Sequence, residues 1–179
     1  MKNILIINTS PRKGGNTEAL AESFAAGAKE AGNNVEIVSL RDKTIAFCRG
    51  CFACQKLGKC VIKDDANEIT DKICNADVVV WATPIYYYSM SGQMKTMIDR
   101  ANSLYSRDYK FREVYLLSVA ADNDPKTDEG AAKGVQGWVD CFDGVTFVDR
   151  LFVGGVNDPG DIKEKEGLTK AFALGKTIK

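Results

Sequence analysis

Residues 4–17 read Ile-Leu-Ile-Ile-Asn-Thr-Ser-Pro-Arg-Lys-Gly-Gly-Asn-Thr, an unbroken apolar run that stops at a group of polar and glycine residues. A short, wholly apolar run is typical of a strand buried on both faces, as at the centre of a parallel sheet. An amphipathic helical pattern follows, with an apolar face made of Leu20, Phe24, Ala28 and Ala31. A buried strand, a polar turn and a helix in this order predict an α/β fold.

The polar turn after this strand collects hydrogen-bond donors. They are the hydroxyls of Thr9, Ser10 and Thr17, the guanidinium of Arg12, and the amides left accessible by Gly14 and Gly15. Asn16 or Thr17 is expected to open the helix, whose first N–H groups lack partners and favour an anion. The turn is a predicted phosphate site, although such residues are also typical of a simple turn with a helix cap.

Length and composition predict one domain over residues 1–179 with a core of ordinary size. Hydrophobic residues make up 45% of the chain, and 24 Lys and Arg balance 24 Asp and Glu. This balance argues against nucleic acid or an anionic membrane as the partner. No apolar stretch approaches the ~20 residues of a membrane span, and no signal peptide is evident, so we expect a cytoplasmic protein.

The chain has no histidine and six cysteines, four of them within residues 48–60. Without imidazole, chemistry must come from carboxylates, thiols, Lys, Tyr or a bound cofactor. In a reducing compartment, cysteines crowded in this way favour metal over disulfides.

Further apolar runs predict strands over residues 35–40, 78–83, 114–121 and 145–153. One helix is expected from Asp64 or Asp65 to about Cys74, and a second after residues 84–89, with Met90, Met94 and Met97 in the core. A third is expected from Pro125 through Phe142, and the last begins at Asp158 and Pro159. Residues 41–63 show no periodicity and are expected to form a functional loop. Five strands alternating with five helices predict a doubly wound parallel sheet, with the ligand at the carboxyl ends of the strands.

Three of those strand ends favour flavin mononucleotide. The first turn lacks the glycine patterns of dinucleotide sites and of ATP or GTP loops, and its donors suit one terminal phosphate. The second turn, Pro84-Ile85-Tyr86-Tyr87-Tyr88-Ser89, supplies a flat surface for a planar ring, although a Tyr triplet is usually core or interface. The third, residues 120–124, meets the same edge of the sheet.

With these motifs the sequence resembles the flavodoxin-like NADPH-dependent FMN reductases, and among them the iron–sulfur flavoproteins. The resemblance covers nearly the whole chain and depends on residues 10–17, 48–60 and 84–88, followed by Gly92-Gln-Met-Lys95 and Asp99-Arg100. It implies a three-layer sandwich around a five-stranded parallel sheet of order 2-1-3-4-5, with FMN as cofactor.

The resemblance also implies roles for particular residues. The FMN phosphate is expected at Ser10, Arg12, Gly15, Asn16 and Thr17, the isoalloxazine ring at Pro84, Ile85, Tyr86, Tyr87 and Tyr88, and the ribityl chain or pyrimidine side of the ring near Ala120 and Asp122. No catalytic side chain is expected, because the flavin carries the chemistry. Cys74 and Cys141 are expected on helices as small hydrophobic residues without a role.

Cys48, Cys51, Cys54 and Cys60 follow the spacing C-x2-C-x2-C-x5-C. The first three match a bacterial ferredoxin motif, and Cys60 is close enough to complete a [4Fe–4S] cluster, although no Pro follows it as it does in ferredoxins. The pattern resembles the compact motif of the iron–sulfur flavoproteins. An exposed cluster can be lost when a protein is purified in air. A four-thiolate zinc site and a metal-free thiol loop are the alternatives.

The resulting hypothesis is an FMN-dependent oxidoreductase that takes electrons from NAD(P)H or a ferredoxin and passes them to a quinone, a flavin or a similar small acceptor. One alternative is an electron carrier that serves protein partners with little NAD(P)H turnover, favoured by the missing nicotinamide fingerprint and opposed by the balanced charge. Another is a domain that binds a phosphorylated metabolite. The resemblance, with exposed aromatic residues at 85–88, adds the expectation of a homodimer or homotetramer.

Overall fold

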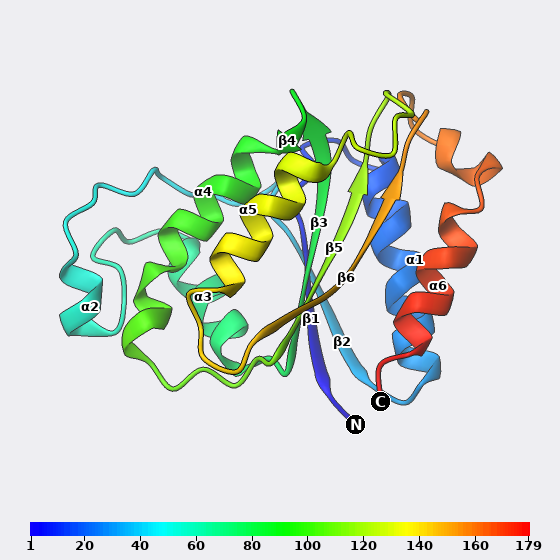
Figure 1. Cartoon of the computed structure of the whole chain (residues 1–179). Helices are drawn as coiled ribbons and strands as arrows, with labels where there is room; N and C mark the ends of the chain where they lie inside the picture. Colours follow the sequence, from blue (N-terminus) through cyan, green and yellow to red (C-terminus); the bar gives the residue numbers. More distant parts are fainter.

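The computed structural model describes residues 1–179 and places a sheet between two layers of helices (Figure 1). The strands are β1 (Asn3–Asn8), β2 (Asn34–Ser39), β3 (Val78–Tyr86), β4 (Ser89–Met90), β5 (Glu113–Val119) and β6 (Thr146–Val153). The helices are α1 (Asn16–Glu30), α2 (Ala53–Leu57), α3 (Ala66–Asn75), α4 (Gly92–Arg100), α5 (Glu129–Val139) and α6 (Gly167–Lys176), with the 3-10 helices η1 (Ala101–Ser106) and η2 (Asp161–Glu164). None of these helices has the length and apolar content of a membrane span.

Five of the strands run parallel in the order β2-β1-β3-β5-β6. This is the expected order 2-1-3-4-5 once the two-residue β4 is set aside. β4 was not predicted, and it pairs antiparallel with the end of β3, where Ile85 lies opposite Met90. Parallel pairing brings the carboxyl ends of the five strands to one edge of the sheet, while both chain termini lie at the opposite edge (Figure 1).

The side chains of β1 alternate between two hydrophobic cores. Leu5 and Ile7 belong to the core under α3, α4 and α5, whereas Ile4 and Ile6 belong to the core under α1 and α6 (Figure 1). None of the four is more than 2% exposed. The prediction of a strand buried on both faces is confirmed, and with it the flavodoxin-like α/β fold.

Met90, Met94 and Met97 are all buried in the α4 side of the core, as predicted. Met94 and Met97 lie on α4, but Met90 lies in β4 and not on the helix where it was expected. Both tryptophans lie in the same core. Trp81 meets Trp138 edge-on, with ring centroids 5.7 Å apart, and Phe111 stacks on Trp138 at 5.6 Å. Aromatic pairs of this kind add specific packing to the area that they bury.

One expected loop and two expected helix boundaries are wrong. Residues 41–63, expected to form a loop, contain the short helix α2. The helix expected at Pro125 begins at Glu129, because side-chain and backbone hydrogen bonds hold the preceding residues in turns. The last helix does not open at Pro159, since η2 comes first and α6 begins only at Gly167.

Two further expectations about single elements need correction. β3 continues to Tyr86, so the first part of the expected loop 84–89 is strand. Cys141 lies beyond the end of α5 and is exposed, unlike Cys74, which is buried on α3 as expected. A small hydrophobic role on a helix therefore holds for Cys74 alone.

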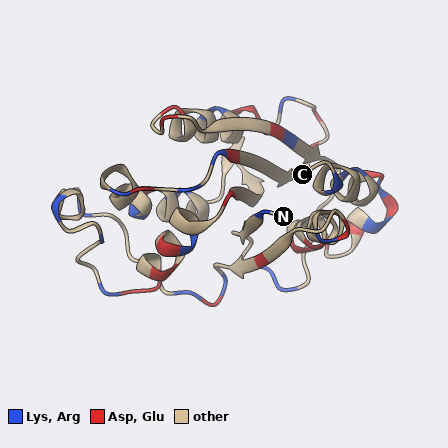
Figure 2. Cartoon of the chain, turned by 90° about the horizontal axis from the view of Figure 1, so that it is seen from below, with Lys and Arg blue, Asp and Glu red and all other residues tan.

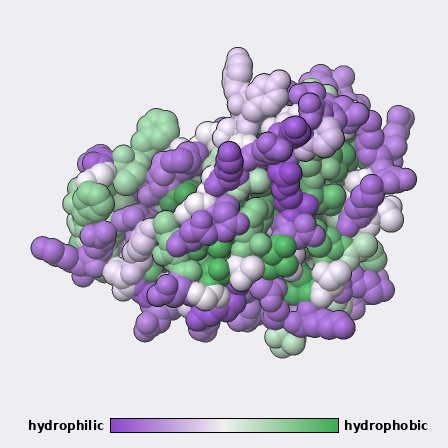
Figure 3. All heavy atoms as spheres, in the orientation of Figure 1, coloured by the Kyte–Doolittle hydropathy of each residue, from purple (hydrophilic) through white to green (hydrophobic).

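Lys and Arg are interspersed with Asp and Glu along the chain, as the view from below shows (Figure 2). Apolar surface gathers on the projection formed by α2 and its flanking loops, at the left of the view in Figure 3. Phe47, Phe52, Leu57 and Val61 are exposed there, with Phe47 at 80%. We call residues 47–61 the cysteine segment.

Candidate functional site

The carboxyl ends of β1, β3 and β5 line one pocket of about 200 Å³, which we call the strand-end pocket. Nine of the predicted cofactor residues line it: Ser10, Arg12, Gly15, Asn16, Thr17, Pro84, Ile85, Tyr86 and Ala120. Five residues that were not predicted complete the lining: Val119, Ala121, Val156, Asn157 and Pro159. The other three predicted residues, Tyr87, Tyr88 and Asp122, do not line it.

The start of α1 presents unbonded amides at this pocket. Gly14 adopts a φ of +62°, which turns the chain into Gly15 and the first helical residue, Asn16. The N–H of Gly14 donates to the Glu18 carboxylate at 2.6 Å. The N–H groups of Gly15, Asn16 and Thr17 donate to no protein group, and amides at the positive end of a helix favour an anion.

Arg12 stands at the rim of the pocket and is exposed. Its Nη1 donates to the carbonyl oxygen of Asn157 at 2.7 Å, and its backbone N–H donates to the Ser10 hydroxyl at 3.2 Å. These two bonds hold the guanidinium beside the free amides and leave most of its N–H groups available. An arginine so placed can form charge-assisted hydrogen bonds with a phosphate.

Thr9 differs from the expectation. Its hydroxyl is fully buried, donates to the carbonyl oxygen of Ala82 at 3.0 Å and lies 3.0 Å from the Ser91 hydroxyl. Ser91 in turn caps α4 by accepting from the N–H of Met94. Thr9 therefore braces β1 against β3 and α4 and does not contribute a donor to the pocket.

Asn16 ties the last part of the chain to the pocket. Its Nδ2 donates to the carbonyl oxygen of Asp158 at 2.9 Å, and its Oδ1 accepts from the N–H groups of Gly160 and Ile162. The Asp161 carboxylate accepts from the N–H groups of Asn157 and Asp158, and these bonds hold its pKa below the usual value. Asn157 and Pro159 reach the pocket through this arrangement.

The tyrosine turn forms a tight hairpin. Tyr86 pairs with Ser89, so Tyr87 and Tyr88 are the two turn residues, with φ values of +49° and +62°. Positive φ at both positions is typical of Asn-Gly turns and is strained for bulky side chains. Tyr87 is fully exposed and Tyr88 is 65% exposed, so these two rings face solvent while Tyr86 lines the pocket.

α5 packs closely beneath this hairpin. A Cβ at Gly130 would lie 2.2 Å from the carbonyl oxygen of Tyr88. The close approach requires glycine at that position and fixes the hairpin to the body of the protein.

At the end of β5, Ala120 lines the pocket and Asp122 does not. The Asp122 carboxylate accepts from the Thr127 hydroxyl at 2.9 Å and from the N–H of Asp124. These hydrogen bonds hold the pKa of Asp122 below its usual value. The Asp122 side chain therefore stabilises the turn after β5, and only backbone groups of this turn are left to contact a ligand.

Cys48, Cys51, Cys54 and Cys60 line a second cavity, of about 410 Å³, between the cysteine segment and the aromatic residues Tyr105, Trp138 and Phe142. All four thiols are free, the first two exposed and the other two half-buried. No group of three or more His, Cys, Asp or Glu side chains is close enough to hold a metal ion in this arrangement. The structure thus brings the four cysteines to one cavity without bringing their sulfurs to one point.

The half-buried cysteines are anchored and the exposed ones are not. Asn102 on η1 donates to the sulfur of Cys54 at 3.3 Å. The Asn67 side chain on α3 bonds both the N–H (3.0 Å) and the carbonyl oxygen (3.1 Å) of Cys60. Cys48 accepts only from the N–H of Gly50, within the segment itself.

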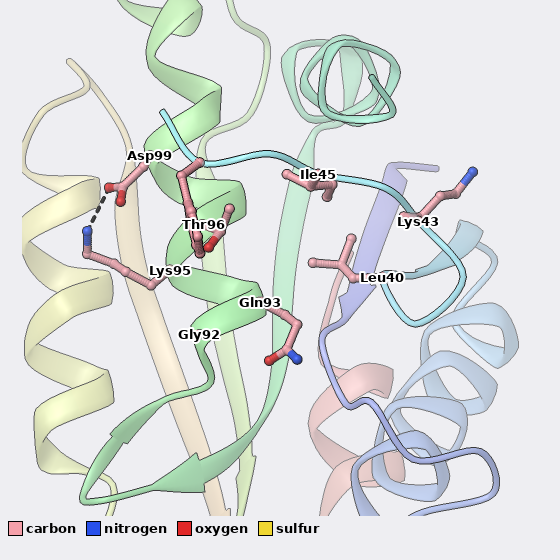
Figure 4. A pocket seen from close by; sticks show the side chains of 9 residues that line it. Leu40, Lys43, Ile45, Gly92, Gln93, Lys95, Thr96 and Asp99 are labelled. Atoms are coloured by element: carbon pink, nitrogen blue, oxygen red, sulfur yellow. Dashed lines mark hydrogen bonds and ion pairs between the residues drawn. The ribbon is translucent and has the colours of Figure 1, made fainter. Parts of the chain in front are cut away.

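A larger cavity, about 550 Å³, lies elsewhere, between the chain after β2 and α4 (Figure 4). Leu40 and Ile45 line it from one side, and Gln93, Thr96 and Lys95 from α4. Lys95 is paired with Asp99 at 2.6 Å. None of the predicted cofactor or metal residues lines this cavity, so size alone does not mark the functional site.

Comparisons with known proteins identify the family of the chain. A family model described as NADPH-dependent FMN reductase matches residues 2–128. An iron–sulfur flavoprotein from Methanocaldococcus jannaschii is 38% identical over an alignment that covers 98% of this chain and 94% of that protein. An iron–sulfur flavoprotein from Methanosarcina thermophila is 29% identical, with 84% and 79% covered.

Among solved structures, the NAD(P)H:quinone oxidoreductase from Methanothermobacter marburgensis superimposes with a TM-score of 0.73 over 98% of this chain and 96% of that chain. The two sequences are 18% identical. At that identity the likeness shows the fold alone.

Proposed function

The chain belongs to the NADPH-dependent FMN reductase family and is an oxidoreductase of that type; from this premise we propose that the strand-end pocket binds FMN. The observation that carries the proposal is that three unbonded amides, two buried hydroxyls and one arginine meet beside the end of β3. This donor set suits a phosphate monoester dianion. We further propose that residues 1–179 act as one FMN-binding domain.

In this assignment each part of the pocket has a distinct task. Gly15, Asn16 and Thr17 donate their N–H groups to the phosphate, while Arg12 pairs with its charge from the rim. The Asn16 side chain bonds the loop 158–162, so only its backbone N–H is available to the phosphate. Pro84 to Tyr86 and Ala120 offer apolar surface to the ring. Because the pocket holds about 200 Å³, less than the ~300–1,000 Å³ typical of ligand pockets, part of the cofactor would extend beyond it.

FMN, when bound, supplies the redox chemistry, accepting hydride from a nicotinamide and passing electrons on to an acceptor. The protein needs no general base for this, and the chain has no histidine to serve as one. We propose NAD(P)H or a ferredoxin as donor and a quinone, a free flavin or a similar small molecule as acceptor. Tyr87 and Tyr88 stand exposed beside the pocket, where they can contact such a molecule.

We also propose that the cysteine segment holds a [4Fe–4S] cluster. In support, four free thiols line one cavity, and Asn102 already donates to one sulfur. The one carboxylate residue of the lining, Asp99, is paired with Lys95. The four thiols fit the donor set of such a cluster, whereas their sulfurs would have to come closer together than they lie here. Hydrogen bonds to sulfur and partial burial are the features that tune such clusters.

The decisive experiment is an absorption spectrum of protein purified without oxygen, with iron and acid-labile sulfide assayed on the same sample. Flavin bands, with broad absorbance that bleaches on reduction and about four irons per chain, are expected. Flavin bands without iron would leave an FMN reductase with a metal-free thiol loop, and zinc in place of iron would give a structural site. A colourless protein that binds no FMN would overturn the proposal.

Turnover separates the enzyme from an electron carrier. Steady-state oxidation of NADPH and NADH with a quinone acceptor is expected to be sustained, whereas a carrier for protein partners would show almost none. We propose a homodimer or homotetramer, supported by the apolar surface of the cysteine segment and the exposed tyrosines. Sedimentation at micromolar concentration tests this, and a monomer would refute it.

A further inference from the structure

The cysteine segment is closed at its base by one buried ion pair. Arg100, at the end of α4, has a fully buried side chain, and Asp64, which follows the segment, is 7% exposed. Nη1 of Arg100 lies 2.6 Å from Oδ2 of Asp64, and Nη2 lies 2.8 Å from Oδ1. This is the two-pronged geometry in which a guanidinium and a carboxylate bind most specifically.

The same guanidinium also reaches both ends of the segment. Nη1 donates to the carbonyl oxygen of Ala46, just before the segment, at 2.7 Å. Nη2 donates to the carbonyl oxygen of Ile62, just after it, at 3.4 Å. Asp64 adds a bond from the N–H of Ala46 at 2.9 Å. One arginine therefore joins the two chain ends that enter and leave the cysteine segment.

The fifth N–H of this arginine has no partner. Nε of Arg100 is buried and forms no hydrogen bond, although a guanidinium has five N–H donors and a buried donor left unpaired is costly. Arg100 and Cys60 line the same cavity. The unpartnered Nε–H and the thiol of Cys60 therefore belong to the lining of one space.

We propose that Arg100 is the positioning residue of the four-cysteine site: it closes the base of the cysteine segment, and its Nε–H is the hydrogen-bond donor to the sulfur of Cys60 when that sulfur binds a metal. The second part rests on the proposed cluster, and the first part does not. Cys60 is then the fixed corner of the site, since Asn67 holds its backbone. Cys48 and Cys51 are the corners that close.

The closure is tested on metal-free protein by trypsin, which can cut at the exposed residues Arg49, Lys56 and Lys59 within the segment. Arg100→Met is expected to be nicked about tenfold faster than wild type, because the base of the segment opens. Arg107→Met is the matched control, since Arg107 pairs with Asp71 at the surface, 2.6 Å away. The double variant Arg100→Met/Asp64→Asn removes both charges of the pair, so that no unpaired charge is buried. It should also be nicked faster than wild type.

The hydrogen bond to sulfur is tested with cobalt(II), added without oxygen to metal-free protein. Arg100→Lys keeps the positive charge but not the Nε–H. Its thiolate-to-cobalt absorption band is expected at lower energy than in wild type, because a thiolate that loses a hydrogen bond donates more strongly. Circular dichroism and FMN binding, measured on every variant, check that each is folded.

Each outcome decides one part of the proposal. Equal nicking of wild type and both Arg100→Met variants would overturn the closure by Arg100. An unshifted cobalt band in Arg100→Lys would overturn the bond to Cys60. A wild-type protein that binds neither cobalt nor iron would overturn the proposed cluster and with it that bond, while the trypsin result would still decide the closure.

Discussion

The strand-end pocket and the cysteine segment are held in place in opposite ways. Around the pocket, short turns, glycine backbone and many separate hydrogen bonds fix the chain directly on the carboxyl edge of the sheet. The cysteine segment stands away from the sheet (Figure 1) and has exposed apolar side chains. The guanidinium of Arg100 joins its two ends, and a few bonds to Cys54 and Cys60 are its other anchors. A rigid site suits a cofactor that must be bound in one orientation, and a hinged loop suits a group that is assembled after folding.

Arg100→Met is expected to have the largest effect on stability. It leaves the Asp64 carboxylate buried without its partner, which costs about 3–5 kcal/mol of unfolding free energy. Urea unfolding measures this, and Arg107→Met should lose no more than about 1 kcal/mol because its pair is at the surface. FMN affinity should stay unchanged, and a parallel loss of FMN binding would show that the two regions are not independent.

The same ion pair predicts a pH dependence. Burial would raise the pKa of Asp64, but hydrogen bonds from Arg100 and from the N–H groups of Ala46 and Ala66 hold it below the usual value. A carboxyl whose folded pKa is depressed stabilises the fold above its unfolded pKa, and this contribution is lost as the pH falls through the folded value. An acid-tolerant protease should therefore cleave the cysteine segment faster below about pH 4 than above it.

Arg12→Ala is expected to weaken FMN binding by about 1.5–3 kcal/mol, which is roughly a 10- to 160-fold rise in Kd. The reason is the loss of a charge-assisted contact with the phosphate. Unfolding free energy should change little, because Arg12 is exposed and makes one side-chain hydrogen bond, to Asn157. Quenching of flavin fluorescence measures the affinity, and an unchanged Kd would move the phosphate to another place.

Tyr87→Gly is expected to raise the unfolding free energy by up to about 1 kcal/mol. Glycine removes the strain of positive φ, roughly 1–2 kcal/mol, and its flexibility in the unfolded chain offsets part of that gain. Tyr87 is fully exposed, so no buried contact is lost. Thermal unfolding should shift upward by a few degrees. If the rings serve the acceptor, quinone turnover should fall at the same time.

The smallest effect is expected for Asp161→Asn, which weakens the bonds to the N–H groups of Asn157 and Asp158. The lowered pKa of Asp161 means that this anchor is present above the unfolded pKa and is lost as the pH falls through the folded one. FMN affinity should drop less than in Arg12→Ala. The fall of FMN affinity toward acid pH should also be shallower in this variant than in wild type. Titration of FMN at several pH values checks both.

Much of the pocket could be predicted because its residues follow the strands directly. The apolar run of β1 indicated a two-sided core, and the polar turn after it indicated the helix start at Asn16. Asn157 and Pro159 could not be predicted, because a tertiary hydrogen-bond set around Asn16 brings them to the pocket. The only signal in the sequence is an amide side chain at the first helical position, which is equally typical of a phosphate ligand.

The missed elements have a common physical cause. The β3–β4 hairpin turns at Tyr87 and Tyr88, which are not residues that favour positive φ, so its sequence does not resemble a turn of this type. α2 has no buried residue, and contacts of Cys54 with Asn102 and Ser106 on η1 hold it. Tertiary contacts decide both elements, and local propensity does not.

The chain has two tryptophans, and both lie in the aromatic cluster on the α5 side of the sheet. Trp138 also lines the cavity of the cysteine segment, beside the four thiols. The protein thus carries its own optical reporter at the cysteine segment. Metal binding or thiol modification should change tryptophan emission without any added label, so the assembly of the segment can be followed in real time.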